Sequence, residues 1–293
     1  MQTIIKNRLK QANLFVCRHP VHRRFNYAVS PYHVLEQKRC HNEGCVQFLW
    51  RCKIYGKDFS CPRGFKHVGR NCGQCKHYYE EKICRKPEPL LDETEMTAYL
   101  GQLEDYRYWI STVEDKRVPF SGQITGVLPS LLKIADYDKS EIRLNGFLLR
   151  FEKAHIGYDL FDDRIYMQVG QSFLRRWQPA ESDTIDCQAI LKTARGRVVV
   201  INPTRIEFLQ GDNQPVIDYS KALVGKTTGE IVEDNCAPCR GCPYGALMDI
   251  VVIRPQPNQY RRFYCLRGVN FSVDCPIRLE EKINAYENQP TET

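Results

Sequence analysis

Fourteen cysteines are the side chains of this 293-residue sequence with the greatest chemical potential. A chain of this length can bury an adequate hydrophobic core without disulfide cross-links. The first residues show no uninterrupted apolar stretch of the kind a secretory signal has, so we expect a cytoplasmic protein. In the reducing cytosol, clustered cysteines more often bind a metal or carry out redox chemistry than form disulfides. The sequence therefore predicts a metalloprotein and leaves the metal open.

The tightest cysteine cluster lies near the C-terminus, where Cys236, Cys239 and Cys242 follow one another at intervals of three and a proline comes next. Three thiolates at this spacing can bind three corners of an iron–sulfur cube ([4Fe–4S]), with a remote cysteine as the fourth ligand. Cys275, which also precedes a proline, is the candidate, and Cys265 is then spare. The alternative is a tetrahedral zinc site built from one Cys-x2-Cys pair plus Cys265 and Cys275. The triplet favours iron–sulfur over zinc, although bacterial ferredoxins place a fourth cysteine within the run.

Eight further cysteines lie within the first 90 residues and divide naturally into two sets of four. Cys72 and Cys75 have the spacing of a metal-binding knuckle. Cys61 before them and Cys84 after them complete one predicted set, for which His77 is an available substitute ligand.

Cys40, Cys45 and Cys52 make up the second predicted set. Its fourth ligand is either Cys17 or a histidine, and one metal cluster plus unpaired thiols is also consistent with the spacing. Zinc and iron–sulfur clusters both accept four thiolates, but the nearby imidazoles slightly favour a zinc site in this segment. The candidate histidines are His19, His22, His33 and His41, which we leave out of the predicted ligands because a histidine near such a site is more often a neighbour than a ligand.

Positive charge is concentrated in the same segment. Residues 1–90 contain 18 Lys and Arg against 6 Asp and Glu, whereas the remaining residues contain 24 against 29. A basic segment with interleaved aromatic residues can bind phosphate backbones and stack on bases, although cations beside thiolates also offset the charge of a metal site. The predicted nucleic-acid contacts of this segment are Arg51, Lys53, Lys57, Arg63, Lys66 and Arg70.

Two closely spaced prolines, Pro87 and Pro89, mark the clearest domain boundary. We predict three domains, at residues 1–88, 89–211 and 212–293. After the boundary, Asp92 and Glu95 have the spacing of a capping box, and apolar residues recur at helical intervals up to Val113. A long amphipathic helix is therefore expected to open the second domain.

Five β-strand patterns follow between residues 118 and 209, at 120–128, 141–151, 164–169, 183–191 and 196–209, with a loop or short helix over 170–180. This count predicts a five-stranded Greek-key barrel of the OB type. In the third domain, strands are expected at 246–253 and 260–267 and a helix at 277–286. The predicted fold class is α+β multidomain, with a small OB-like β-barrel flanked by two cysteine-rich metal-binding domains.

The second and third strands of such barrels often bind single-stranded nucleic acid. Strand alternation, however, puts Phe147, Leu149 and Phe151 on one face, and if this face is the core then these side chains fill the barrel. Cys187 lies in the apolar phase of a strand and is expected to be buried rather than catalytic. The candidate nucleic-acid contacts of the barrel are Arg143, Arg150, Arg164, Arg175, Arg176 and Trp177.

The sequence lacks the glycine-rich phosphate loops and the metalloprotease and hydrolase motifs of common enzymes. Their absence disfavours an enzymatic function. No apolar run approaches the ~20 residues of a membrane span, so no membrane partner is expected. The preferred interpretation is a metal-cluster protein, with iron–sulfur and/or zinc, that binds RNA or single-stranded DNA. The alternative is an iron–sulfur electron-transfer protein that docks on an acidic protein partner, and a third possibility is a scaffold with structural zinc.

Overall fold

The computed structural model describes residues 3–55, 60–233, 239, 242–254 and 257–279. The chain divides into two compact units. The cysteine-rich unit contains Arg8–Gly101, and the β-sheet unit contains Met1–Asn7 together with Gln102–Thr293. The predicted division into three domains stays a prediction.

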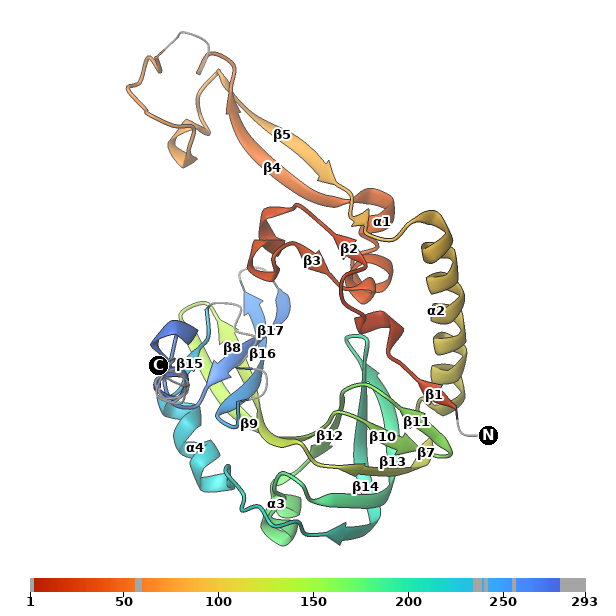
Figure 1. The fold of residues 1–293 in the computed structure, drawn as a ribbon. Coiled ribbons are helices and arrows are strands. Elements are labelled where there is room, and N and C mark those ends of the chain that lie inside the picture. The colour runs from red at the N-terminus through yellow and green to blue at the C-terminus, as the bar shows by residue number, and fades with distance from the viewer. Residues whose placement is uncertain (1–2, 56–59, 234–238, 240–241, 255–256, 280–293) are drawn as a thin grey trace, which may run out of the picture. The chain divides into compact units, whose positions relative to one another are not determined.

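The β-sheet unit is a mixed α/β structure built on a large sheet of twelve strands (Figure 1). Most of its neighbouring strands are antiparallel. From one edge to the other the strands are β1 (Ile4–Ile5), β11 (Asp159–Phe161), β10 (Ala154–Ile156), β7 (Arg117–Gln123), β13 (Thr184–Ala194), β14 (Arg197–Leu209), β12 (Ile165–Val169), β9 (Lys139–Phe151), β8 (Gly126–Asp136), β16 (Gly245–Arg254), β17 (Asn258–Cys265) and β15 (Glu230–Ile231).

Strands lie close to each of the five predicted positions. The first predicted strand is found as two, β7 and β8, which only residues 124 and 125 separate. β7 pairs with β13, whereas β8 pairs with β9. β12 pairs antiparallel with β9 and parallel with β14. A short helix, α3 (Gln171–Trp177), lies between β12 and β13, where the sequence predicted a loop or short helix.

The hydrophobic core of this unit forms from the alternating side chains of these strands. Phe147, Leu149 and Phe151 have no exposed surface, so the interpretation that they belong to the core is confirmed. The ring of Phe151 packs edge-on against Phe120 at a centroid distance of 5.0 Å. Cys187 is also buried, at 7% exposure, as its apolar phase in β13 predicted.

The two strands expected near the C-terminus are present as β16 and β17, and β16 extends the sheet by pairing parallel with β8. Before them, helix α4 (Tyr219–Thr228) begins at Asp218, whose carboxylate accepts a hydrogen bond from the Lys221 amide at 2.8 Å. A 3₁₀ helix, η6 (Ser272–Asp274), follows β17. Most of the helix predicted at 277–286 lies outside the described residues.

Helix α2 (Glu93–Val113) matches the predicted amphipathic helix, and its capping box is confirmed. The Glu95 amide donates to the Asp92 carboxylate at 2.8 Å, and the Asp92 amide donates to the Glu95 carboxylate at 3.1 Å. Further along, the Trp109 indole donates to Asp159 at 2.9 Å and stacks on Phe161. Among the described residues, no helix is both long and apolar enough to cross a membrane.

The cysteine-rich unit contains short elements and one long β-hairpin (Figure 1). The hairpin consists of β4 (Cys45–Cys52) and β5 (Tyr78–Arg85), which form a two-stranded sheet of their own. No described residue between 45 and 98 is buried. The short elements are η1 (Arg8–Lys10), β2 (Phe15–Val16), η2 (Pro20–Phe25), β3 (Ala28–Val29), the π-helix η3 (Tyr32–Gln37), α1 (Cys40–Glu43), the 3₁₀ helix η4 (Arg70–Cys72) and β6 (Glu88–Pro89).

Candidate metal centres

One group of thiols and imidazoles gathers at the root of the hairpin, and we call it the root cluster: Cys17, His22, His33, Cys40 and Cys45. Each residue comes from a different short element. Cys17 directly follows β2, His22 lies in η2, His33 lies in η3, Cys40 begins α1, and Cys45 begins β4. The root cluster therefore collects residues from the first 45 positions of the chain at one point.

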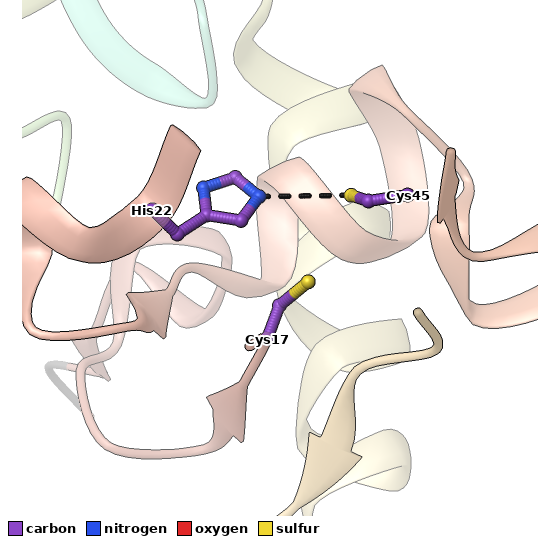
Figure 2. A group of neighbouring side chains, drawn as sticks. All are labelled: Cys17, His22 and Cys45. Carbon is purple, nitrogen blue, oxygen red and sulfur yellow. Dashed lines mark hydrogen bonds between the residues drawn. The ribbon is translucent and has the colours of Figure 1, made fainter. Parts of the chain in front are cut away.

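The side chains of the root cluster form two overlapping trios that could hold a metal ion. The ligand atoms of Cys17, His22 and Cys45 lie within 4.8 Å of one another, and so do those of His33, Cys40 and Cys45. Figure 2 shows the His22 ring directed at the Cys45 thiol, with Nε2 and Sγ 3.6 Å apart, and the Cys17 thiol beside them. Cys45 belongs to both trios, so it lies at the centre of the root cluster.

Burial sets the protonation of the root cluster when no metal is bound. Burial raises the pKa of the Cys17, Cys40 and Cys45 thiols, while the nearby Lys38 ammonium lowers the pKa of Cys40 and Cys45. Burial also lowers the pKa of His33, with Lys38 and Lys10 adding to the effect. A lowered pKa keeps an imidazole neutral, which is the form that ligates a metal.

The other histidines of this region differ in their bonding. His19 caps η2, where its Nδ1 accepts a hydrogen bond from the Val21 amide at 3.2 Å, and its Nε2 lies 3.1 Å from the Val46 carbonyl oxygen. Both ring nitrogens of His19 therefore contact backbone groups. The Nε2 of His33, by contrast, is buried and has no hydrogen-bond partner in the described part of the chain.

A second group of thiols gathers at the opposite end of the hairpin, and we call it the tip cluster: Cys52, Cys61, Cys72 and Cys75. All four line one cavity of about 20 Å³, a volume on the scale of a single water molecule. Cys61 begins a turn that is closed by a hydrogen bond from the Gly64 amide to the Cys61 carbonyl at 2.9 Å. Cys72 and Cys75 share a turn in which the Cys75 amide donates to the Cys72 carbonyl at 2.8 Å.

The two clusters group the cysteines differently from the predicted sets. Cys52 lies opposite Tyr78 at the tip end of the hairpin, whereas Cys84 lies opposite Val46 at the root end. Six residues of extended strand separate Tyr78 from Cys84, or about 20 Å. The structure therefore brings Cys52 together with Cys61, and it places Cys84 on the exposed surface of β5.

The C-terminal cysteines approach one another beside β16 and β17. Cys242 has Cys265 and Cys275 as neighbouring thiols, and backbone hydrogen bonding from Tyr244 and Gly245 lowers the pKa of its thiol. Burial raises the pKa of the Cys242 thiol, and the two neighbouring thiols raise it further. The turn is tight, because a Cβ atom at Gly245 would lie 2.9 Å from the Cys239 carbonyl oxygen.

Among the described C-terminal cysteines, Cys242, Cys265 and Cys275 are therefore neighbouring thiols. Cys236, the first member of the triplet, lies outside the described residues. Amide groups that donate to a cysteine sulfur favour its thiolate form, which is the form that binds zinc or an iron–sulfur cluster. The cysteines and histidines of the root cluster could hold a metal ion, and thiolates and imidazoles suit zinc or iron–sulfur.

The predicted cationic contacts of the hairpin remain largely on its surface. Lys53, Arg63, Lys66 and Arg70 are all exposed. Arg63 donates to the Asn71 carbonyl at 3.2 Å and lies over the Phe65 ring. Arg51 pairs with Glu81 at 2.7 Å on the strands themselves, and Lys57 lies outside the described residues. Lys76, which the prediction did not include, is also exposed.

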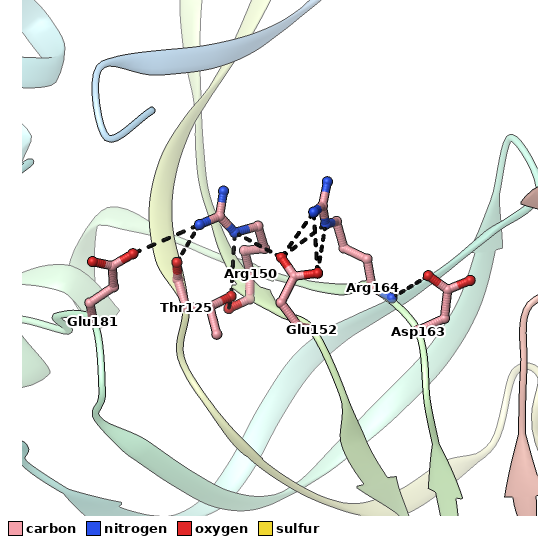
Figure 3. A network of polar contacts seen from close by, with 6 residues as sticks. All are labelled: Thr125, Arg150, Glu152, Asp163, Arg164 and Glu181. Atoms are coloured by element: carbon pink, nitrogen blue, oxygen red, sulfur yellow. Dashed lines mark hydrogen bonds and ion pairs between the residues drawn. The ribbon is translucent and has the colours of Figure 1, made fainter. Parts of the chain in front are cut away.

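The predicted contacts on the strands of the β-sheet unit are mostly engaged within the protein, as Figure 3 shows for Arg150 and Arg164. Arg150 is only 6% exposed, its Nε donates to the Thr125 hydroxyl at 3.3 Å, and it pairs with Glu152 and Glu181. Arg164 also pairs with Glu152, at 3.0 Å. The buried guanidinium of Arg150 faces protein groups, so we leave it out of any proposed surface.

The remaining barrel candidates are more accessible. Arg143 is exposed and pairs with Glu141 at 2.7 Å. Arg175 and Arg176 are exposed on α3, where Arg175 lies over the Tyr219 ring and Arg176 over the Trp177 ring. Trp177 itself is half-buried and packs against Phe208.

Sequence reasoning left His22 and His33 out of its predicted ligands and gave Cys17 only as one option for a fourth ligand, yet all three belong to the root cluster. A signal for Cys17 existed in the even number of cysteines in the basic segment. None distinguished His33 from His19, because both lie at irregular spacing from the cysteines.

The chain matches no protein-family model, no curated protein and no solved structure.

Proposed function

We propose that this protein is a zinc-dependent nucleic-acid-binding protein that contacts RNA or single-stranded DNA through the tip of the β4–β5 hairpin. One observation carries the proposal: the loop between the two strands, residues 53–77, combines the tip cluster with a dense set of exposed cations. In its described part this loop has no carboxylate side chain. Its exposed cations are Lys53, Arg63, Lys66, Arg70 and Lys76.

The charge of the tip supports phosphate binding rather than mere compensation of a metal site. A zinc ion with four thiolates carries a net charge of about −2. The five exposed cations exceed this charge, so the loaded tip stays positive. A compact positive loop attracts the phosphate backbone of nucleic acids, and this attraction falls steeply with salt.

The strands of the hairpin supply a surface for unpaired bases. Phe48 and Trp50 lie on one face of β4, directly opposite Lys82 and Glu80 of β5, and are 57% and 44% exposed. Aromatic side chains beside cations stack on bases of any sequence when the bases are not paired. The combination favours a single strand over a duplex, whose bases are already stacked.

For the β-sheet unit, we propose that residues 117–209 form a closed barrel of the OB type. Three features support this. The β7–β8 segment pairs with β13 at one end and with β9 at the other, β12 and β14 are parallel, and α3 lies between β12 and β13. A Greek-key barrel of five strands has these same connections. In this proposal Arg143, Arg175, Arg176 and Trp177 of this unit are secondary contacts for nucleic acid.

For the C-terminal cysteines, we propose an iron–sulfur cluster. The spacing of Cys236, Cys239 and Cys242 suits three corners of the cluster, and Cys275, which precedes a proline and like Cys265 neighbours Cys242, is the proposed fourth ligand. Iron and acid-labile sulfide in the anaerobically purified protein, with absorbance near ~400 nm that is lost in Cys242→Ser, would support the cluster. A colourless protein with zinc alone would replace it with a structural zinc site.

Binding of a fluorescein-labelled oligonucleotide, measured by anisotropy across a range of salt concentrations, tests the nucleic-acid proposal. Lys66→Ala and Arg70→Ala should each reduce the logarithmic salt slope by about one. Lys192→Ala, which removes a cation of the β-sheet unit, is the matched control and should leave the slope unchanged. Absent or salt-independent binding would refute the proposal.

The stacking surface has its own control on the same hairpin. Trp50→Ala should weaken binding of the single strand by about 1–3 kcal/mol, the usual loss of one base–aromatic stack. Tyr79→Ala removes an equally exposed aromatic ring from the opposite face, where Tyr79 pairs with Arg51, and should have little effect. Equal losses in the two variants, or a preference for duplex, would exclude the stacking surface.

A further inference from the structure

We infer that the root cluster is a second zinc site, independent of the tip cluster, in which Cys17, Cys40, Cys45 and the Nε2 atom of His33 bind the ion. The two sites together hold β4 at both of its ends. This inference does not depend on nucleic-acid binding, because it concerns how the hairpin is built and held.

His33 is assigned as the fourth ligand by its surroundings. Its Nε2 is buried without a hydrogen-bond partner in the described residues, and leaving a buried polar atom unpaired costs free energy that a metal bond would offset. A ring nitrogen of His33 shares one trio with the sulfurs of Cys40 and Cys45. Three thiolates and one imidazole are a common ligand set for structural zinc.

His22 has a different place in the root cluster. Its ring already contacts the Cys45 sulfur through Nε2, and it meets the His33 ring edge-on at a centroid distance of 4.8 Å. The 3.6 Å between these two atoms is also the spacing expected of an imidazole and a thiolate that share one zinc ion, and His22 forms a trio with Cys17 and Cys45, so His22 is the alternative imidazole ligand. His19 uses both ring nitrogens on backbone groups and is therefore excluded.

The charges around the root cluster suit this assignment. When zinc binds, the three thiols release their protons to solvent and become thiolates, while the neutral imidazole donates an electron pair. The resulting site has a net charge of about −1. Lys38 and Lys10 lie close enough to influence the charges of the root cluster, so cations are in place to offset that charge.

The position of the two sites on β4 explains why the hairpin needs them. Cys45 is the first residue of β4 and Cys52 is the last, which places the two sites about 24 Å apart along the strand. A two-stranded hairpin is marginally stable on its own in water, and no described residue of this one is buried. Metal sites at root and tip supply the stabilisation that a hydrophobic core supplies elsewhere.

Zinc content per chain, measured by atomic emission on the full-length protein, tests whether the sites are separate. Cys45→Ser and Cys52→Ser should each lose one zinc ion, and the double variant should lose two. Cys84→Ser removes an exposed thiol of the same hairpin and should lose none. A double variant that loses no more zinc than either single variant would show that one site accounts for both cysteines and would overturn the inference.

Cobalt substitution tests the ligand set even if Cys45→Ser releases both ions through unfolding. His33→Cys should keep the full metal content and convert the root site to four thiolates, with stronger sulfur-to-cobalt absorbance. His22→Ala and His19→Ala should keep both the metal and the spectrum. An unchanged spectrum in His33→Cys, or a lost ion in His22→Ala with His33→Ala unaffected, would remove His33 from the ligand set.

Discussion

The two units of this protein reach a defined structure by different physical means. The β-sheet unit buries large side chains such as Phe147, Leu149 and Phe151 completely. In the cysteine-rich unit, the described side chains that are apolar, buried and not cysteine are only Leu14, Phe15, Val29, Pro31, Val34 and Tyr99. All six lie outside the hairpin. Burial of apolar area is the main favourable term in folding, so the hairpin must be stabilised in another way.

This difference in buried apolar side chains indicates that the cysteine-rich unit depends on bound metal for its stability and the β-sheet unit depends on its core. A core distributes stability over many contacts, and each contact can be weakened without loss of the fold. A metal site concentrates the stability in four metal–ligand bonds, so loss of one ligand can release the ion and unfold the segment that it held. We therefore expect substitutions of ligands to act locally and completely, and substitutions in the core to act gradually.

The largest effect is expected from removing the knuckle of the tip cluster. Cys72→Ser combined with Cys75→Ser should release the tip zinc and expose residues 53–77 to proteolysis, because structural zinc contributes on the order of 10 kcal/mol to such small folds. Limited proteolysis followed by mass spectrometry would locate the cuts. Cys84→Ser is the control, and equal resistance of the double variant and the wild type would contradict a structural tip site.

A smaller effect is expected from a cavity in the β-sheet unit. Phe151→Ala should destabilise this unit by about 3–5 kcal/mol, because the ring is fully buried and packs against Phe120. The zinc content of the cysteine-rich unit should not change in this variant. Urea unfolding, followed together with metal analysis, would show both outcomes. Loss of zinc from the cysteine-rich unit in this variant would weaken the distinction between the two units.

Arg150 gives a still smaller test within the same unit. Its guanidinium donates to both the hydroxyl and the carbonyl of Thr125, and Gly126 leaves room for it. Arg150→Ala should cost about 1.5–3 kcal/mol, the range for hydrogen bonds to a charged group. Nucleic-acid affinity at constant folded fraction should stay the same. A selective loss of affinity would instead return Arg150 to the binding surface.

Two cysteines outside the clusters should differ in reactivity rather than stability. Burial raises the pKa of the Cys187 thiol to about 12, so at pH 8 only about one thiol in 10,000 is the reactive thiolate. Iodoacetamide should therefore modify exposed Cys84 while leaving Cys187 intact, and peptide mass spectrometry would report both. Rapid modification of Cys187 in the folded protein would show that the sheet opens easily.

Local patterns in the sequence predicted local structure well. The Asp92–Glu95 capping box, the strands of the sheet and the buried phase of Cys187 all depend on neighbouring residues, and all are present. The grouping of the cysteines depends instead on how the hairpin pairs. Cys52 and Cys84 are equally plausible ligands by spacing, and only the register that places them at opposite ends separates them.

The role of Arg150 could not be predicted from the sequence, because it also depends on how the strands are arranged in space. Arginine in the polar phase of a strand is typical of a solvent-facing side chain, but this one turns toward the gap between β7 and β8, where Thr125 accepts its hydrogen bonds. His33 is similar, because its buried Nε2 becomes visible only when η3, α1 and β4 are placed together.

Hydrogen exchange of the native protein, measured by mass spectrometry before and after zinc is removed with a chelator, is the most direct test of the central claim. We predict that amides of β4 and β5 lose their protection on chelation, while those of β13 and β14 keep theirs, because only the hairpin depends on metal at both ends. Unchanged protection in β4 and β5 after complete removal of zinc would contradict the account.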